Sequence, residues 1–165
     1  MNRKNYLDNR KIMIVDDDQD ILDTLEELLS MSKVVKQKNF EEAANLLNSK
    51  RFDIAILDIV GVDGYELLSI ANKRNILSVI LTTQAFSVED TGRTLKKGAP
   101  LFIPKEKMIE IEIYLNDILE ARKEGENVWW RWMDRFDSYN EDRFGIDWKN
   151  RSRPLIEYFP YFVCH

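Results

Sequence analysis

The sequence predicts a three-layer α/β protein in which helices cover both faces of a parallel sheet. Five short apolar runs rich in β-branched residues begin 20 to 25 residues apart, at Ile12, Val34, Ile54, Val79 and Leu101. Each interval leaves room for a strand, a helix of about three turns and two short loops. Right-handed crossovers between such strands place helices on both faces of one sheet.

The strands are expected at the apolar runs. The central runs are continuously apolar rather than alternating, which is typical of parallel strands that are covered on both faces. The last run is followed by Pro104, which an edge strand tolerates. The predicted strands are 12–15, 34–35, 54–57, 79–81 and 101–103.

Helices are expected between the strands. Residues 21–29 carry leucine and isoleucine at i, i+3 and i+4 spacing, and Asp18 and Asp20 are expected to be charges at the N-terminus of that helix. Gly98 is expected to end the fourth helix in a left-handed conformation. The other predicted helices are 41–47, 65–70, 88–95 and 108–119.

Composition excludes several classes of protein. Lys and Arg number 24 and Asp and Glu 29, so the net charge of −5 lacks the basic surplus of a nucleic-acid binder. No apolar run approaches the roughly 18 residues of a membrane span, and no signal peptide is recognised at the start. Cys164 and His165 are the only cysteine and histidine, which excludes an internal disulfide, a zinc cluster and a Ser/His or Cys/His active site. A cytoplasmic protein is expected.

The composition changes beyond residue 122. All four tryptophans fall within 129–148, and Trp129, Trp132, Met133 and Phe136 share one face at helical spacing, with Gly145 as a stop. We expect 1–9 to be a leader, 10–122 the main domain and 123–165 an aromatic-rich helical extension. The extension either packs on the main domain or serves as a docking or dimerisation helix. Its balanced charge and the lack of a helix-turn-helix pattern argue against direct DNA binding.

Acidic, hydroxyl and amine groups follow the strands. Asp16 and Asp17 come after the first strand, Asp58 after the third, Thr82 after the fourth and Lys105 after the fifth. The carboxyl ends of parallel strands form one edge of the sheet, where ligands bind. Clustered carboxylates hold a hard cation such as Mg²⁺. A cation, a lysine and a further carboxylate are the groups that phosphoryl transfer requires.

These motifs resemble the receiver domain of bacterial two-component response regulators. The resemblance rests on Ile-Met-Ile-Val-Asp-Asp-Asp at 12–18, Phe-Asp-Ile-Ala-Ile-Leu-Asp at 52–58, Val-Ile-Leu-Thr-Thr at 79–83 and the segment from Gly98 to Lys105, over residues 10–121. It implies a flavodoxin-like sheet of order 2-1-3-4-5. It also implies a phosphoprotein of a signal-transduction phosphorelay rather than an enzyme, beyond its own phosphorylation and dephosphorylation.

The resemblance implies roles for individual residues. Asp58 matches the phosphoacceptor, and Lys105 matches the amine that pairs with the phosphoryl group. Asp16 and Asp17 match the acidic pair that binds Mg²⁺ with Asp58, and the main-chain carbonyl of Val60 matches the remaining protein ligand.

The resemblance also implies a switch and partners. Thr82 matches the hydroxyl that turns toward the phosphoryl group, and Phe102 matches the aromatic residue that turns inward behind it. The phosphodonor would be a sensor histidine kinase or phosphotransfer protein. The output would be contacts with a downstream protein, and two copies of the chain could form a homodimer.

The sequence departs from the family at three places. The loop 58–64 is about two residues short and lacks Met-Pro, Thr83 replaces a small residue, and Glu106 rather than proline follows Lys105. Two alternatives remain. One is a degenerate receiver that acts as an interaction module without phosphorylation. The other rests on the Asp-x-Asp pattern at 16–18, which resembles the motif of phosphatases of the haloacid-dehalogenase type, with Asp16 as nucleophile and Asp18 as acid/base.

Overall fold

Strands and helices alternate along the chain as the spacing of the apolar runs predicts. The computed structural model describes residues 4–59, 62–83, 101–126, 131, 134–145 and 147. The strands are β1 (Lys11–Val15), β2 (Lys33–Gln37), β3 (Ile54–Asp58), β4 (Leu77–Thr82) and β5 (Leu101–Pro104). The helices are α1 (Gln19–Leu28), α2 (Phe40–Ser49), α3 (Gly64–Lys73), the 3₁₀ helix η1 (Lys105–Glu110), α5 (Ile111–Lys123) and α7 (Asp137–Phe144).

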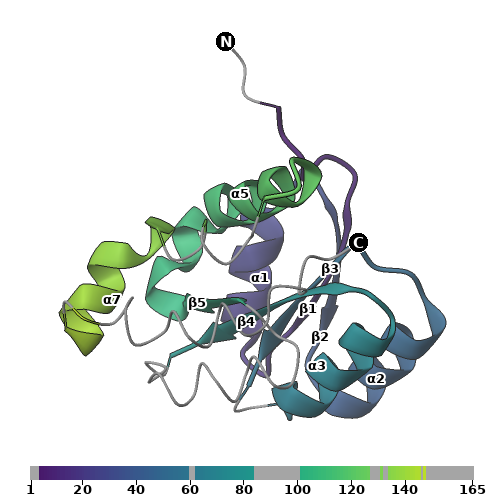
Figure 1. Cartoon of the computed structure of the whole chain (residues 1–165). Coiled ribbons are helices and arrows are strands. Elements are labelled where there is room, and N and C mark those ends of the chain that lie inside the picture. The colour runs from purple at the N-terminus through teal and green to yellow at the C-terminus, as the bar shows by residue number, and fades with distance from the viewer. Residues whose placement is uncertain are drawn as a thin grey trace.

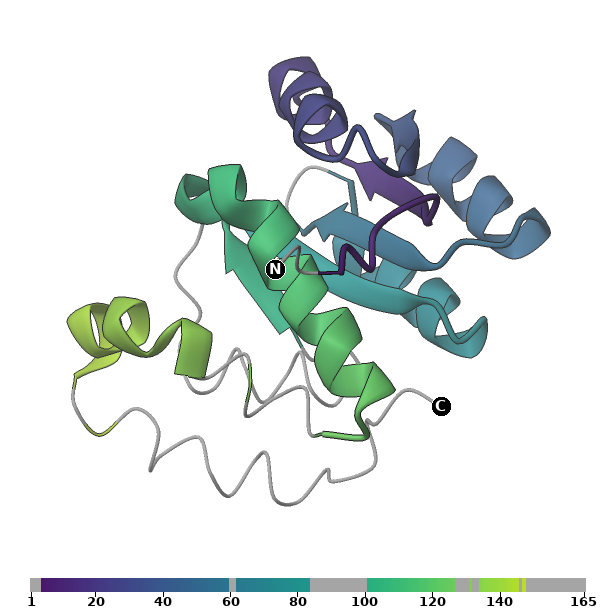
Figure 2. The same cartoon turned by 90° about the horizontal axis from the view of Figure 1, so that it is seen from above.

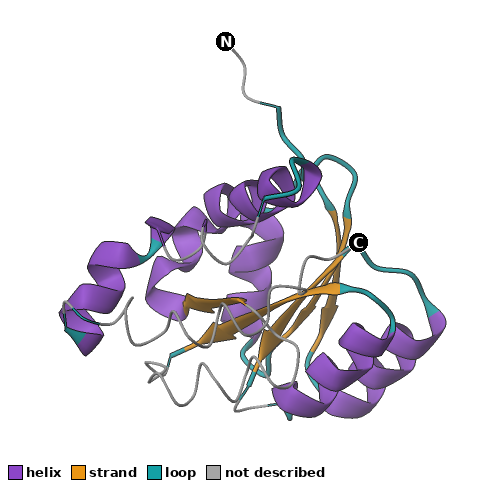
Figure 3. Ribbon diagram, in the orientation of Figure 1, coloured by secondary structure: helices purple, strands orange, loops and turns teal. Residues whose placement is uncertain are grey.

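The five strands form one sheet of order β2-β1-β3-β4-β5, and every neighbouring pair is parallel. Helices α1 and α5 cover one face, and α2 and α3 cover the other (Figures 1 and 2). Figure 3 shows the sheet as a single layer between them. The predicted fold class and strand order are confirmed. The order reverses between β1 and β3, which places a ligand site at the carboxyl ends of these two strands.

The core lies on both faces of the central strands. Every residue of β3 and β4 is buried, whereas β2 at the edge has no buried residue. Pro104 lies in the opposite edge strand, as predicted. The segment before β1 also contributes, because Leu7 is fully buried and the Tyr6 N–H donates to Asn116 Oδ1 on α5 at 2.8 Å.

The helix predicted for 108–119 differs from the observed one. Residues Lys105–Glu110 form a 3₁₀ helix with no buried side chain, and α5 begins at Ile111, which is fully buried. Met108 packs only in part against the core and Ile109 is 76% exposed, so this segment has little packing that would favour the α-helical geometry. The predicted helix 88–95 and its cap at Gly98 lie outside the described residues. None of the described helices is long and apolar enough to cross a membrane.

The extension is described in part. Helix α7 ends before Gly145, which has φ of +88° and confirms the predicted stop. Trp129, Trp132 and Met133, which were expected on the apolar face, lie outside the described residues. Phe136 is buried, and its ring centroid lies 4.6 Å from that of Tyr114 on α5.

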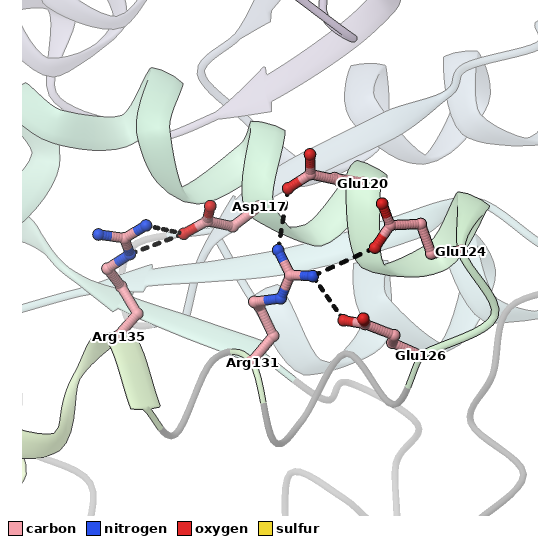
Figure 4. Close-up of polar contacts among 6 residues, drawn as sticks. All are labelled: Asp117, Glu120, Glu124, Glu126, Arg131 and Arg135. Carbon is pink, nitrogen blue, oxygen red and sulfur yellow. Dashed lines mark hydrogen bonds and ion pairs between the residues drawn. The ribbon is translucent and has the colours of Figure 1, made fainter. Parts of the chain in front are cut away.

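Two arginines join the extension to α5 (Figure 4). Arg135 Nε donates to Asp117 Oδ2 at 2.6 Å, and the Asp117 side chain is only 5% exposed. Arg131 contacts three carboxylates, Glu120 on α5 at 2.9 Å and Glu124 and Glu126 just after the end of α5. This part of the extension packs on α5, which is the first of the two expectations for it.

Candidate functional site

The acidic site begins where β1 ends. Asp16 follows β1 directly, and its N–H donates to Gln37 O at 3.2 Å, which continues the strand pairing for one more residue. The Asp16 side chain is buried, and Oδ1 accepts the Asp18 N–H at 2.9 Å. Asp17 between them is exposed. The turn therefore holds one carboxylate inside and leaves its neighbour in solvent.

Asp18 has a structural role. It is the N-cap of α1, and its Oδ1 accepts the Asp20 N–H at 2.9 Å. Such a cap satisfies one of the free N–H groups at a helix start. Asp20 lies in the first turn, where a negative charge is favourable. The interpretation of both residues as charges of the helix N-terminus is confirmed.

Lys105 connects the two buried carboxylates. It is the first residue of η1, directly after β5, and its Nζ lies 2.8 Å from Asp16 Oδ2 and 3.6 Å from Asp58 Oδ1. Asp58 is the last residue of β3 and is 5% exposed. The fold thus brings together Asp16, Asp58 and Lys105 from three strand ends, as the sequence predicts.

Burial and charge act on Asp16 in opposite directions. Burial raises the pKa of its carboxyl, Lys105 and the Asp18 N–H lower it, and the charge of Asp58 raises it again, with a net increase. Among the described residues, Asp16 Oδ2 accepts no aligned hydrogen bond, so its approach to Lys105 is a charge contact. A buried carboxylate oxygen that accepts no hydrogen bond destabilises the folded state.

Lys105 remains a cation in this environment. Burial lowers the pKa of its ammonium, but the close contact with Asp16 and the charges of Asp16 and Asp58 outweigh burial and raise it. The Lys105 side chain is 15% exposed, so the ammonium is within reach of a small anion that enters from solvent.

The site has the donor set of a divalent cation site. Asp16, Asp17 and Asp58 each offer a carboxylate oxygen, and these three oxygens lie within 4.8 Å of one another. Hard cations such as Mg²⁺ prefer carboxylate oxygens. The Asp16 oxygen without an aligned donor fits such a ligand set, because a cation would complete its coordination. Val60, whose carbonyl is the expected further ligand, lies outside the described residues.

The two switch candidates lie on adjacent strands, Thr82 on β4 and Phe102 on the edge strand β5. Thr82 is buried as the last residue of β4, and Thr83 after it is exposed. Phe102 on β5 pairs with Ile80 and is 4% exposed. Thr82 therefore lies at the carboxyl end of its strand, as Asp58 does. Phe102 is buried on the neighbouring strand, beside a residue two positions before Thr82.

Gly64 packs against the backbone of Asp58. A Cβ atom at Gly64 would lie 2.2 Å from the carbonyl oxygen of Asp58, and the Gly64 N–H donates to Ile59 O at 3.2 Å. Asp63 before it has φ of +52°, a left-handed conformation that Asp adopts more readily than most residues. Asp63 and Gly64 therefore form the turn at which α3 begins, directly against the end of β3.

The comparison with protein families agrees with the geometry. The family model described as the response regulator receiver domain matches residues 12–115. The chain belongs to this family, so it is a receiver domain of two-component response regulators. The family is a signalling domain rather than a classical class of enzyme.

Curated relatives are similar over the same region. The heme response regulator HssR of Staphylococcus haemolyticus is 32% identical over 99 residues, which are 58% of this chain and 44% of that protein. The transcriptional regulatory protein YrkP of Bacillus subtilis is 30% identical over 117 residues, which are 68% of this chain and 50% of that protein. The chain spans about half the length of these relatives.

Solved structures show the same fold. The CheY-like receiver domain protein of Methanospirillum hungatei has 28% identity and a TM-score of 0.58, and the match covers 70% of this chain and 98% of that one. The receiver domain of the Francisella response regulator 1452 has 27% identity and a TM-score of 0.60, with 70% and 99% covered.

Some residues that shape the site were not predicted. Gly64 carries no chemistry, and only its contact with the Asp58 carbonyl shows why a side chain is excluded; the Asp-Gly pair after a strand is the signal that indicates a tight turn. The close approach of Lys105 to Asp16 was not predicted either, because side-chain distances across a sheet edge depend on tertiary packing.

Proposed function

We propose that Asp58 accepts a phosphoryl group in the presence of Mg²⁺, and that the resulting charge alters contacts with other proteins. The observation that carries this proposal is the Lys105 ammonium, 2.8 Å from Asp16 and 3.6 Å from Asp58, beside three carboxylates suited to a cation. A carboxylate nucleophile with a lysine and a cation site beside it is suited to phosphoryl transfer.

The donor in this proposal is a histidine kinase or a phosphotransfer protein. An Asp58 carboxylate oxygen forms the new P–O bond, the P–N bond of the donor's phosphohistidine breaks, and its electron pair stays on the imidazole nitrogen, which takes up a proton. Asp16, Asp17, Asp58 and the Val60 carbonyl would hold Mg²⁺, which supplies charge neutralisation for the phosphoryl oxygens. Lys105 pairs with the phosphoryl group from the other side.

The switch and output complete the proposal. The phosphoryl group carries roughly 1.5 to 2 negative charges in place of the single charge of the Asp58 carboxylate, and the Thr82 hydroxyl donates to it. Phe102 responds to the position of Thr82, so the surface near β5 changes between two states. Residues 10–122 form the receiver in this scheme, and 123–165 the extension. A cytoplasmic location and a downstream protein target, without direct DNA binding by this chain, belong to the same proposal.

The phosphatase alternative has no observation in its favour. It needs Asp18 as acid/base, whereas the Asp18 carboxylate caps α1 through the Asp20 N–H. It also needs Asp16 as nucleophile, whereas Asp16 Oδ1 accepts the Asp18 N–H and Oδ2 lies 2.8 Å from the Lys105 ammonium.

The test is intact mass after incubation with acetyl phosphate and MgCl₂. We expect a single phosphoryl adduct on the wild type, none on Asp58→Asn and none with EDTA. Asp63→Asn is the matched control, since it makes the same chemical change nearby and asparagine tolerates a left-handed conformation. An adduct that persists on Asp58→Asn would contradict the assignment, and no adduct on the wild type would favour the degenerate receiver.

A further inference from the structure

A basic hollow lies at the edge of the sheet opposite the acidic site. Its volume is about 780 Å³, and its walls come from the start of β1, the loop before β3, the loop between α3 and β4, and the end of α5. These are the amino ends of the strands, whereas Asp16, Asp58 and Lys105 lie at the carboxyl ends. The walls carry six cations: Lys11, Lys50, Arg51, Lys73, Arg74 and Arg122.

The positive charge of this basic hollow is not balanced by its own walls. Of the residues that the structure describes, Asp53 is the one acid that lines it, and its carboxylate already accepts the Lys11 N–H at 2.8 Å and contacts Arg10 at 3.4 Å. In the described part of the chain, no ion pair is formed by four of the cations, all exposed: Lys50, Arg51, Lys73 and Arg74. These positive charges are concentrated in one place although the chain as a whole has a net charge of −5.

Helix dipoles account for only part of this arrangement. Helices α2, α3 and α5 end at this edge, and cations near helix C-termini are favourable. Each helix end carries about half a negative charge, so three ends supply about 1.5 negative charges against the four exposed cations that form no ion pair in the described part of the chain. The hollow is comparable in size with the Debye length of about 8 Å, so salt screens the repulsion between the cations only in part. A bound anion would remove that repulsion.

The walls favour recognition of charge over recognition of rings. Phe52 is the one aromatic residue among the described residues that line the hollow, it is 8% exposed, and the Lys11 ammonium lies 5.0 Å from its ring centroid. The described walls therefore offer no open ring face for stacking, on which single-stranded nucleic acids depend. The arginines, in contrast, offer paired N–H donors that match phosphate oxygens.

We propose that this basic hollow binds a compact anion with several phosphate groups, such as the polyphosphate chain of a nucleotide or an inorganic polyphosphate. Its volume lies in the range of small-molecule sites, roughly 300 to 1,000 Å³. Its cations converge from four segments around a concave surface rather than along a row, which suits a compact ligand. The proposal is independent of phosphorylation at Asp58.

The test is calorimetric titration with inorganic tripolyphosphate in EDTA, so that no metal assists binding at the acidic edge. We expect one site on the wild type, weakened by added salt. Arg51→Gln/Arg74→Gln should weaken binding at least tenfold, because it removes two cations from the walls. The matched control is Lys36→Gln/Lys38→Gln, which makes the same change of charge on and just after β2, and it should bind within twofold of the wild type. Thermal melts verify that both variants fold.

Further ligands separate the sources of the phosphate groups. Equal affinity for ATP and tripolyphosphate would assign recognition to the phosphate chain, and tighter binding of ATP would add a contact with the nucleoside; both support the proposal. The absence of binding would overturn it, as would an equal loss in the control variant. Tighter binding to a duplex oligonucleotide, increasing with its length, would overturn it in favour of a nucleic-acid surface.

Discussion

Asp16 and Asp117 are both buried and both face a cation from another segment, but their carboxylates are bonded in different ways. Asp117 Oδ2 accepts Arg135 Nε at 2.6 Å. Asp16 shares Lys105 with Asp58, and its Oδ2 has no aligned donor among the described residues. The Asp117 pair joins the extension to α5, whereas the Asp16 cluster keeps negative charges together at a free energy cost that a bound cation would offset.

The two carboxylates are expected to contribute to different properties, Asp117 to stability and Asp16 to function. An ion pair with good geometry is expected to matter for folding and not for phosphorylation. A buried carboxylate held beside other carboxylates is expected to matter for phosphorylation and to lower stability. Each of the following variants changes one side of this contrast.

The largest effect is expected at Gly64, which supports the acidic site from behind. Gly64→Ala places a Cβ 2.2 Å from the Asp58 carbonyl oxygen, so the loop must shift. We expect a loss of about 3 kcal/mol in the free energy of unfolding and a phosphorylation rate reduced more than tenfold. Urea denaturation and the acetyl phosphate assay measure the two quantities.

Gly125→Ala is the control for that variant. Gly125 also has a positive φ, +71°, but nothing lies within 4 Å of a Cβ there. It should cost only the conformational penalty of about 1 kcal/mol and leave phosphorylation unchanged. Equal effects of the two substitutions would show that the contact with Asp58 has no importance.

Asp16→Asn should impair function without loss of stability. Removal of a cation ligand should reduce the Mg²⁺-dependent phosphorylation rate by about 10- to 100-fold. The free energy of unfolding should stay constant or rise, because the desolvated charge is gone. Rates at varied MgCl₂ and urea denaturation measure both. Asp117→Asn should show the reverse pattern, with a normal rate and reduced stability; a normal rate in Asp16→Asn would remove Asp16 from the site.

Arg135→Ala should destabilise the protein and leave phosphorylation unchanged. It leaves the buried Asp117 carboxylate without its guanidinium partner, which costs about 3 to 5 kcal/mol for a fully buried pair. The Arg135 side chain is 41% exposed, so solvent screening reduces the expected loss to about 1 to 2 kcal/mol. Arg131→Ala, whose partners are more exposed, should cost less than 1 kcal/mol. A larger loss for Arg131→Ala would contradict this ranking.

The smallest effect concerns Tyr114 beside the extension. Burial and the hydrogen bond from its hydroxyl to Glu110 at 2.6 Å raise the pKa of the phenol well above 10. A raised pKa in the folded state gives stability that is complete below pH 10 and is lost as pH rises through the folded pKa, because the unfolded chain ionises first. Glu110→Gln should lower the pKa. The measurement is the ultraviolet titration of tyrosinate, with Tyr114→Phe identifying the late step; unchanged titration in Glu110→Gln would exclude the carboxylate as a cause.

Most of the fold could be predicted because it rests on periodic local signals. The apolar runs at 54–57 and 79–81 are strands buried on both faces, and their spacing leaves room for the helices that cover them. The edge that holds Asp16, Asp58 and Lys105 follows from strand direction alone.

Other features depend on packing that the sequence does not reveal. The 3₁₀ geometry of Lys105–Glu110 reflects missing burial, and the Asp117–Arg135 pair reflects how the extension lies on α5. The basic hollow gathers residues from four segments that no single motif connects.

The central claim is that Asp58, and not Asp16, is the residue that becomes phosphorylated. The most direct measurement treats the wild-type protein with acetyl phosphate and MgCl₂, reduces the acyl phosphate with borohydride and maps the product by peptide mass spectrometry. We expect homoserine at position 58 and unmodified aspartate at positions 16 and 17. Homoserine at position 16, with Asp58 unchanged, would contradict it.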